Sequence, residues 1–390
     1  METWRKIRLG DACKTNMDSY SPKEEWDFVN YLDTGNITDN RIDSIQYIDV
    51  KSEKLPSRAR RKVKNDSIIY STVRPNQRHF GIIKSQPENF LVSTGFAVID
   101  TYAQILDADF LYYLLTQATL VEALHAIAEQ STSAYPSIKP SDIEDLEIEI
   151  PDIATQKKIA DILGSLDRKI TQNTEVNDNL LQQLHQMYLH ILSSSDTDIL
   201  LGSVINTTSG GTPSRKHDEY YSNGSICWVK SKELLSGYIH DTEEHINELA
   251  VEKSSAKLLP THSVLVAMYG ATVGAYGIIA KPMTCNQAVC ALLSNEKYPY
   301  TYLFQLACES QQKLINLAVG SAQQNISQVL IKQLPVHRNI EAIHQFHSLA
   351  QPMHEEIESL QAENAKLAAI RDSLLPKLMS GELDVTNIDL

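Results

Sequence analysis

The 390-residue sequence lacks the features of a secreted, disulfide-bonded or membrane-spanning protein. Its five cysteines are scattered and form no CxxC pair, which argues against a disulfide framework or a zinc site and fits a reducing compartment. The N-terminal segment has no apolar h-region, so no secretory signal is expected. The most apolar uncharged run, residues 264–280, is interrupted by glycines. We therefore expect a globular, cytoplasmic protein without a membrane segment.

Catalytic motifs are also missing. The chain contains no GxGxxG, P-loop, HExxH or GxSxG motif, no paired carboxylates and no Asn-Pro-Pro-Tyr-like tetrad. Nucleotide hydrolysis, metalloprotease, serine hydrolase and DNA methyl-transfer sites are therefore unsupported. The histidines are spread out, and the closest pair, His344 and His347, falls on an expected coiled-coil helix. We expect no catalytic or metal site in this chain.

Positive charge is scarce overall but concentrated in one segment. The net charge of −14 argues against a nucleic-acid binder, which usually presents a basic face. Residues 51–64, however, contain seven basic side chains against the single acidic Glu53. Among them, Arg58, Arg60 and Arg61 are candidate DNA contacts, and a solvated surface is the plain alternative. The chain thus has a local basic patch within an acidic protein.

A long helix is predicted in the middle of the sequence, over residues 152–193. Apolar or special residues there alternate in steps of four and three, which is the pattern of a coiled-coil seam. The seam residues are Ile159, Leu163, Leu166, Ile170, Asn173, Asn177, Leu180, Leu184, Met187 and Ile191. Such a helix is roughly 60 Å long at about 1.5 Å per residue, and its narrow apolar stripe needs a partner helix.

A second helix with the same pattern is predicted near the C-terminus, over residues 340–379. Its seam residues are Phe346, Ala350, Met353, Ile357, Leu360, Asn364, Leu367, Leu374 and Leu378, with Arg371 as the one poor match. A shift of 187 residues superimposes the two patterns, which favours an antiparallel pair within one chain over dimerisation or separate core packing. Asn177 and Asn364 are expected to fix the register. Pro352 and Pro376 predict kinks or restarts in the second helix.

The repeat extends beyond the helices. Residues 67–83 match 263–279 without a gap at an offset of 196, and residues 9–11, 94–98 and 138–146 match 201–203, 285–289 and 326–334. Each copy reads as short strands, a helix (109–129 or 300–319), a polar loop, a last strand and the heptad helix. The predicted fold is therefore α/β (α+β), with two globular domains joined by two long helices in an internal two-fold repeat. The expected segments are a first domain at 1–151, a helix at 152–193, a second domain at 194–338, a helix at 339–383 and a tail at 384–390.

Loops rich in hydrogen-bonding side chains occupy corresponding places in both copies. Arg, Asn and Gln read base edges in the major groove, while Ser, Thr and Lys hold phosphates. Ordinary turn chemistry also favours several of these residues. Because the framework repeats while the loop contents differ, the loops suit two different DNA half-sites. The candidates are Arg74, Asn76, Gln77, Arg78 and Tyr135 in the first copy and Ser214, Lys230, Tyr269, Thr272, Gln323, Gln324 and Asn325 in the second.

Several motifs in this order resemble one known family. They are Gly211-Thr212-Pro213-Ser214, Ile226-Cys227-Trp228-Val229, the segment from Ile150 to Ala160, Leu166-Asp167-Arg168-Lys169-Ile170, and the ending from Leu374 to Leu383. Together they resemble the specificity subunits of type I restriction-modification systems over essentially the whole chain. The first copy departs from the pattern, because it lacks the Gly-Thr-Pro-Ser motif and has Gly95-Phe96 where the second copy has Asn286-Gln287.

The resemblance implies a non-catalytic DNA reader that assembles with two modification (methyltransferase) subunits and with restriction (motor/nuclease) subunits. Each recognition domain would read half of a bipartite, asymmetric target in double-stranded DNA, and the helices would set the spacing and dock the modification subunits. S-adenosylmethionine, ATP and magnesium are then expected on the partners, with no cofactor on this chain. A structural adaptor with two protein-binding modules is the alternative that the acidic pI favours, and a stand-alone methyltransferase lacks its cofactor motifs.

Overall fold

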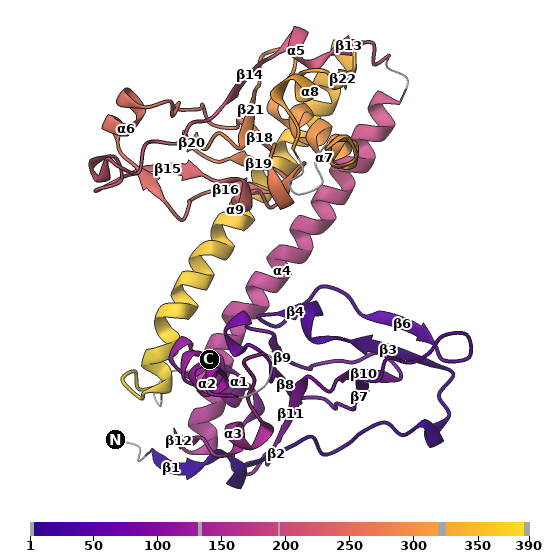
Figure 1. The fold of residues 1–390 in the computed structure, drawn as a ribbon, viewed down its shortest axis with the longest axis vertical. Coiled ribbons are helices and arrows are strands. Elements are labelled where there is room, and N and C mark those ends of the chain that lie inside the picture. Colours follow the sequence, from indigo (N-terminus) through magenta and orange to yellow (C-terminus); the bar gives the residue numbers. More distant parts are fainter. Residues whose placement is uncertain (1–3, 132–134, 194–195, 319–324, 386–390) are drawn as a thin grey trace. The chain divides into compact units, whose positions relative to one another are not determined.

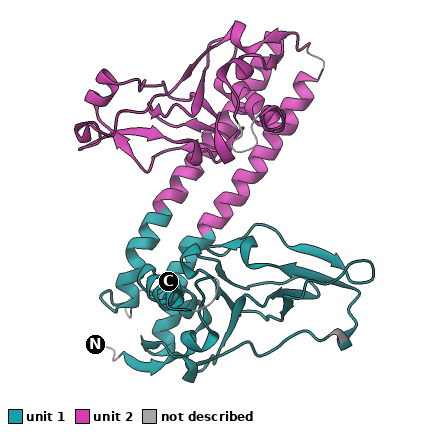
Figure 2. Cartoon of the chain, in the orientation of Figure 1, with its two compact units in different colours: residues 1–168, 367–390 teal, residues 169–366 magenta. Residues whose placement is uncertain are grey.

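The chain forms two compact units in a computed structural model that describes residues 4–131, 135–193, 196–318 and 325–385 (Figure 2). Unit 1 comprises residues 1–168 and 367–390, and unit 2 comprises residues 169–366. Two helices of 40 residues each, α4 (Ile153–Leu192) and α9 (Ile340–Met379), contribute residues to both units. The domain boundaries expected from the sequence stay a prediction, because these units divide the long helices differently.

Unit 1 contains two four-stranded sheets (Figure 1). One has the order β6-β3-β10-β7 and the other β2-β11-β8-β9. Their strands are β2 (Cys13–Thr15), β3 (Phe28–Leu32), β6 (Gln46–Asp49), β7 (Ala59–Arg61), β8 (Ile68–Ser71), β9 (Phe80–Ile82), β10 (Phe90–Ser93) and β11 (Phe96–Thr101). The remaining elements are β1 (Arg5–Arg8), which pairs with β12 (Glu147–Ile150), the hairpin β4 (Ile37–Thr38) and β5 (Arg41–Ile42), and helices α1 (Ala108–Leu115), α2 (Ala118–Glu129) and α3 (Pro140–Glu144). Every side chain of β8 is buried: Ile68, Ile69 and Tyr70 are apolar or aromatic, and the Ser71 hydroxyl donates to the Val73 carbonyl at 3.0 Å.

Unit 2 contains a five-stranded and a three-stranded sheet, of order β14-β21-β18-β19-β16 and β17-β15-β20. Their strands are β14 (Asn206–Ser209), β15 (Ile226–Val229), β16 (Tyr238–Ile239), β17 (His245–Ile246), β18 (Val264–Ala267), β19 (Tyr276–Ile279), β20 (Thr284–Cys285) and β21 (Val289–Leu293). The other elements are β13 (Ile199–Leu200), which pairs with β22 (Pro335–Val336), and helices α5 (Leu201–Val204), α6 (Glu248–Lys253), α7 (Tyr300–Leu317) and α8 (Gln328–Lys332). The helix expected over 300–319 is thus present as α7.

The two units repeat the same framework. In unit 1, Ile68 pairs with Ile82 between β8 and β9, and in unit 2 Val264 pairs with Ile278, which is the predicted offset of 196 on both strands. The backbone N–H of Leu9 donates to Leu146 at 2.8 Å, and that of Leu201 donates to Leu334 at the same distance. The internal repeat is therefore confirmed, and the mixed helix and strand content fits the expected fold class.

One stretch of the predicted repeat is out of register. The ladders pair Phe96 with Ser71 in unit 1 and Val289 with Ala267 in unit 2, so Phe96 corresponds to Val289 at an offset of 193. The sequence match of residues 94–98 with 285–289 is therefore wrong by two residues. The sequence match aligned the dipeptide Ala97-Val98 with Ala288-Val289, but these two dipeptides occupy different positions relative to the paired strand.

The helix predicted over residues 109–129 is two helices. It breaks between α1 and α2, where Gln117 adopts a non-helical conformation with φ of −59° and ψ of 137°. The Thr116 hydroxyl donates to the Tyr113 carbonyl at 3.2 Å, and the Gln117 amide donates to the Leu114 carbonyl at 3.3 Å. These side chains cap carbonyls that a continuous helix would bond through its backbone.

No single helix in the described part of the chain is long and apolar enough to cross a membrane. The bent pair α1 and α2, at 67° to each other, passes the same test of length and composition when the two are taken together.

The second heptad helix, α9, is continuous through both of its prolines, so the predicted restarts are wrong, whereas a kink at each proline stays a prediction. A proline inside a helix removes one backbone hydrogen bond and costs about 3 kcal/mol. On either side of Pro352, Ala350 and Ile357 are buried in the core of unit 2, and just after Pro376 the side chains of Leu378 and Met379 are buried in unit 1. Tertiary packing thus holds the helix together across each proline.

The two long helices pack against each other in an antiparallel direction. Within unit 2, Asn173 donates to Asn364 at 2.9 Å, and the rings of Tyr188 and Phe346 lie 5.6 Å apart. All the predicted seam residues lie at buried or half-buried positions. Among them, Ile159, Asn177, Leu184 and Ile357 are buried, and Leu166, Ile170, Leu180, Met353, Asn364 and Leu367 are half-buried. Asn364 is therefore a cross-helix contact, whereas the side-chain oxygen of Asn177 is buried without a hydrogen-bond partner among the described residues.

Candidate nucleic-acid interface

In unit 1 the predicted reading loop forms a tight turn between β8 and β9. A short 3-10 helix, Pro75–Gln77, lies between Arg74 and Arg78, and both arginines have left-handed backbones with φ of 47° and 58°. This conformation is uncommon for residues other than glycine and costs of order 1–3 kcal/mol each. At the tip, Asn76 and Gln77 are exposed and make no side-chain hydrogen bond to the described residues. The strained loop therefore presents two amide side chains to solvent.

Arg74 and Tyr135 come together although 61 positions separate them in the sequence. The guanidinium of Arg74 lies over the Tyr135 ring, 5.1 Å from its centre, and the backbone N–H of Arg74 donates to Pro136 at 2.9 Å. Tyr135 is 59% exposed. The stack holds a planar cation beside an exposed aromatic ring, and both groups can stack on or hydrogen-bond to nucleic acid.

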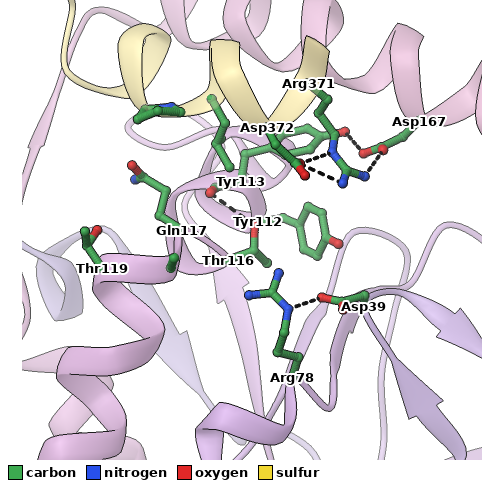
Figure 3. A pocket seen from close by; sticks show the side chains of 13 residues that line it. Asp39, Arg78, Tyr112, Tyr113, Thr116, Gln117, Thr119, Asp167, Arg371 and Asp372 are labelled. Atoms are coloured by element: carbon green, nitrogen blue, oxygen red, sulfur yellow. Dashed lines mark hydrogen bonds and ion pairs between the residues drawn. The ribbon is translucent and has the colours of Figure 1, made fainter. Parts of the chain in front are cut away.

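Arg78 is placed differently from the other candidates. Its Nε donates to Asp39 at 2.6 Å, and its guanidinium lies over the Phe80 ring at 5.1 Å. The side chain faces a cavity of about 640 Å³ that Tyr112 and Arg371 also line (Figure 3). Because Asp39 already neutralises Arg78, this arginine contributes less free positive charge than the sequence predicts.

The basic segment is also partly neutralised. Lys51 pairs with Asp27 at 2.8 Å, Lys62 with Glu24 at 2.5 Å and Lys64 with Asp100 at 3.6 Å. The three arginines behave differently: Arg58, Arg60 and Arg61 have no carboxylate partner among the described residues. Arg58 and Arg60 are exposed, whereas Arg61 is half-buried and burial lowers its pKa. The arginines and Lys54, which likewise has no ion-pair partner among the described residues, therefore supply the uncompensated positive charge of this segment.

One turn connects the arginine segment with the reading loop of unit 1. The N–H of Thr94 donates to the Arg58 carbonyl at 2.8 Å, and the N–H of Thr72 donates to the Gly95 carbonyl at 2.8 Å. Burial opposes ionisation of nearby Asp33, but hydrogen bonds from its neighbours and the charge of Arg58 lower its pKa overall. The fold thus places both the arginine segment and the reading loop of unit 1 next to the short connection between β10 and β11.

In unit 2 the Gly-Thr-Pro-Ser motif is held by close backbone packing. A methyl group on Gly210 would lie 2.0 Å from the Cys285 carbonyl oxygen, so only glycine fits there. The indole N–H of Trp228 donates to the Gly211 carbonyl at 3.0 Å, and the Tyr221 hydroxyl donates to the Pro213 carbonyl at 2.6 Å. These contacts fix the motif and leave Ser214, the next residue, exposed.

Sequence reasoning missed the cationic stack that follows this motif. The guanidinium of Arg215 lies 4.2 Å from the centre of the Tyr221 ring and 5.5 Å from that of Trp228, and it bonds to Glu244. Lys230 bonds to the same carboxylate. Hydrogen bonds from Lys230 and Arg215 outweigh burial and lower the pKa of Glu244. Arg215 directly follows the motif, and that position is the signal from which it could have been proposed.

The other candidates of unit 2 lie around one turn, residues 285–289. Its backbone bonds to Gly211, to Val229 and to Met268, and so connects the Gly-Thr-Pro-Ser motif, the end of β15 and the loop after β18. In that loop Tyr269 forms an isolated antiparallel bridge with Asn325. The Thr272 hydroxyl donates to the Tyr269 carbonyl at 3.2 Å and so serves the turn itself. The predicted residues Gln323 and Gln324 lie outside the described residues.

Comparison with known proteins matches both units to one family model. The model of the type I restriction modification DNA specificity domain matches residues 1–182 and again residues 197–337. This chain belongs to that family. The specificity subunit is 24% identical to the HindI specificity subunit of Haemophilus influenzae, over 98% of this chain and all of that one. It is 26% identical to the MjaIX specificity subunit of Methanocaldococcus jannaschii, over 72% of this chain and 70% of that one.

A solved structure shows the same fold. The type I restriction-modification S subunit from M. genitalium matches with a TM-score of 0.61 at 16% identity, over 97% of this chain and 96% of that one. Each of the two family domains in our specificity subunit therefore corresponds to one copy of the repeat. Both copies place loops of different composition around the same β-strand connection, residues 93–95 in unit 1 and 286–288 in unit 2.

Proposed function

We propose that each recognition domain of this specificity subunit reads one half of a bipartite, asymmetric sequence in double-stranded DNA. The observation that carries the proposal is the family match over both copies, combined with loops that differ on a shared framework. In unit 1 the proposed readers are Arg74, Asn76 and Gln77, with Arg58 and Arg60 holding phosphates. In unit 2 they are Ser214 and Tyr269 with Asn325, together with Arg215 and Lys230, two cations that share the single carboxylate of Glu244.

The helical pair is proposed to set the distance between the half-sites and to dock the partner subunits. Two reading heads that address successive major grooves on one face of B-DNA sit about 34 Å apart, or a multiple of that distance. Helices of 40 residues are long enough to span it, at about 1.5 Å per residue. The proposed assembly contains two modification subunits and, in the nuclease form, restriction subunits, in the cytoplasm. This chain is proposed to be non-catalytic, with S-adenosylmethionine, ATP and magnesium bound by those partners.

The adaptor alternative predicts no positive concentration of charge near the reading loops. Arg58, Arg60 and Arg61 lack carboxylate partners among the described residues, which favours DNA binding over the adaptor alternative. The net charge of −14 remains compatible with DNA binding, because partner subunits can enclose the DNA and supply basic surface.

The deciding experiment is genome-wide mapping of adenine methylation by single-molecule sequencing. Cells that carry this chain and its modification subunit are compared with cells from which only this chain is deleted. We expect a bipartite asymmetric motif that is methylated in the first and unmethylated in the second. If the same motif stays methylated after the deletion, another protein reads the DNA and the adaptor function gains support.

A second arm assigns the half-sites to the units. Replacement of Arg74, Asn76 and Gln77 by alanine should relax one half of the methylated motif and leave the other half unchanged. Replacement of Ser214 and Arg215 should relax the opposite half. Relaxation of the same half by both variants would contradict the assignment of one half-site to each domain.

A further inference from the structure

Three side chains with different donor atoms meet at the edge of the three-stranded sheet in unit 2. Cys227 on β15 and His245 on β17 are direct cross-strand partners, so their side chains project from the same face of the sheet. Asp241 lies in the loop between β16 and β17. Its Oδ1 is 3.3 Å from the Cys227 Sγ and 2.8 Å from the His245 Nε2. One thiol, one imidazole and one carboxylate are thus brought together from three separate segments.

We propose that Cys227, Asp241 and His245 form a binding site for one divalent transition-metal ion, with zinc as the expected occupant. The three donor atoms lie within 4.8 Å of one another. Around a tetrahedral zinc ion with ordinary bond lengths, donor atoms lie roughly 3.3–3.5 Å apart. The carboxylate of Asp241 is exposed and can turn outward to admit an ion between the three groups. Water completes the fourth position.

The donor set selects among metals. A thiolate with an imidazole suits zinc and cobalt, whereas calcium and magnesium prefer oxygen ligands alone. A divalent ion bound to one thiolate, one carboxylate and a neutral imidazole gives a site without net charge. Burial and the hydrogen bond to Asp241 raise the pKa of the Cys227 thiol, while the charge of Lys281 lowers it. Metal binding therefore releases a proton and strengthens with rising pH.

The proposed ion would stabilise the loop that carries the cation-binding carboxylates of unit 2. Only two residues separate Asp241 from Glu244, which bonds to Arg215 and Lys230. Thr242, between them, accepts from the Trp228 N–H at 3.1 Å and donates to the Glu244 carbonyl at 2.7 Å. An ion that joins this loop to β15 and β17 would hold the neighbouring carboxylate in place. The proposed role of the ion is structural, because it would cross-link the loop that carries Asp241 to β15 and β17, next to the proposed reading residues.

Cobalt provides a direct test on the full chain, without DNA, so its outcome is independent of the proposed function. The chain is purified, treated with chelator and titrated with Co²⁺. We expect one equivalent to bind with a near-ultraviolet thiolate-to-cobalt charge-transfer band and visible bands of four-coordinate cobalt. Zinc should displace the cobalt and abolish the bands. Absence of the charge-transfer band in the wild-type chain would overturn the proposal and leave a hydrogen-bonded trio.

Variants locate the site. Cys227→Ser should abolish the charge-transfer band, whereas Cys308→Ser, at a half-buried thiol elsewhere in unit 2, should leave it unchanged. Asp241→Asn and His245→Gln, at more exposed positions, should each weaken cobalt binding by at least about 10-fold while the metal-free chain stays folded. A band that survives Cys227→Ser, or that disappears with Cys308→Ser, would place the metal elsewhere and overturn the assignment.

Discussion

Neutralisation by neighbouring carboxylates distinguishes the candidate DNA-contacting residues from one another. Arg78 is paired with Asp39, whereas Gln77 at the tip of the same loop has no side-chain partner among the described residues. Residue type alone ranks Arg78 first, because arginine is the commonest reader of guanine. The ion pair changes that order, since an arginine must leave Asp39 before it can bond to a base. The exposed amides can reach DNA without breaking any bond.

The first prediction concerns Gln77. Gln77→Ala should weaken specific DNA binding by about 1–3 kcal/mol, because a bidentate base contact is lost, and should leave the thermal stability unchanged. Gln86→Ala is the matched control, since this exposed glutamine follows the opposite end of β9. The measurement is the affinity for cognate and random DNA of the complex that this chain forms with the proposed modification subunits. Equal losses on both DNAs would show that Gln77 does not read bases.

A buried histidine predicts the pH dependence of unit 2. His354 is fully buried on α9, its Nδ1 lies 3.1 Å from the Tyr238 hydroxyl, and its Nε2 has no partner among the described residues. Burial, reinforced by repulsion from His262 and His347, lowers its pKa from 6.5 to about 3. The unfolded chain therefore binds more protons than the folded chain between these values. Stability is lost as the pH falls through this range.

The second prediction follows from this sign. His354 should account for about 2 kcal/mol of lost stability when the pH is lowered from 7 to 5. His354→Gln keeps an acceptor for Tyr238 but does not titrate, so its free energy of unfolding should change less over that range. His190→Gln, at an exposed position on α4, should retain the wild-type slope. Identical slopes for wild type and His354→Gln, measured by urea unfolding, would show that another group dominates.

At the scale of elements, backbone packing around the turn at residues 285–289 positions the motif of unit 2. The third prediction is that Gly210→Ala destabilises unit 2 by about 1–3 kcal/mol, because the new methyl group would clash with the Cys285 carbonyl. Gly35→Ala is the control, since nothing lies within 4 Å of the added methyl group there. Thermal unfolding of the two variants checks this, and equal stability would mean that the turn yields without cost.

The fourth prediction concerns the poor seam residue of α9. Arg371 donates to Asp167 on α4 at 2.7 Å, and Asp167 also accepts from the Tyr113 hydroxyl at 2.6 Å. Arg371→Ala should cost about 1–2 kcal/mol, a value discounted because both charged side chains are 31% exposed. Arg168→Ala removes an exposed arginine from the same part of α4 and should change the free energy of unfolding by less than about 0.5 kcal/mol. A smaller loss for Arg371→Ala than for Arg168→Ala would contradict the ion pair's role.

The long helices, the strands β8, β9, β18 and β19, and their repeat could be predicted because apolar periodicity and a constant offset are properties of the sequence itself. The continuity of α9 could not, because the burial of Ile357 and Leu378 that offsets the prolines is tertiary. The break at Gln117 depends on local side-chain caps that no periodicity reveals. The same limit applies to the candidate site. Loop positions were predictable, but the pairing of Arg78 with Asp39 and of Arg215 with Glu244 joins residues 39 and 29 positions apart.

At the scale of the whole molecule, the two copies of the repeat share a framework of strands and helices but differ in their candidate DNA-reading loops. In both units the equivalent central strands pair in the same way and the core includes residues of α4 and α9, whereas the loops around the equivalent connections share little chemistry. A change within one reading loop should therefore alter one half-site alone. We propose that the distance between half-sites is instead set by α4 and α9, which both have residues in each unit.

The last prediction tests whether the two long helices set the distance between the half-sites. Seven residues are inserted between Arg168 and Lys169 in α4 and seven between Lys366 and Leu367 in α9, where the two compact units divide. A full heptad in both helices preserves the seam and adds roughly 10 Å of rise, equivalent to up to about three base pairs. In methylation maps, both half-site sequences should stay the same while the spacer between them lengthens. The same insertion in α4 alone breaks the cross-helix register and should abolish methylation, whereas an unchanged spacer in the double insertion would show that the helices do not set the distance.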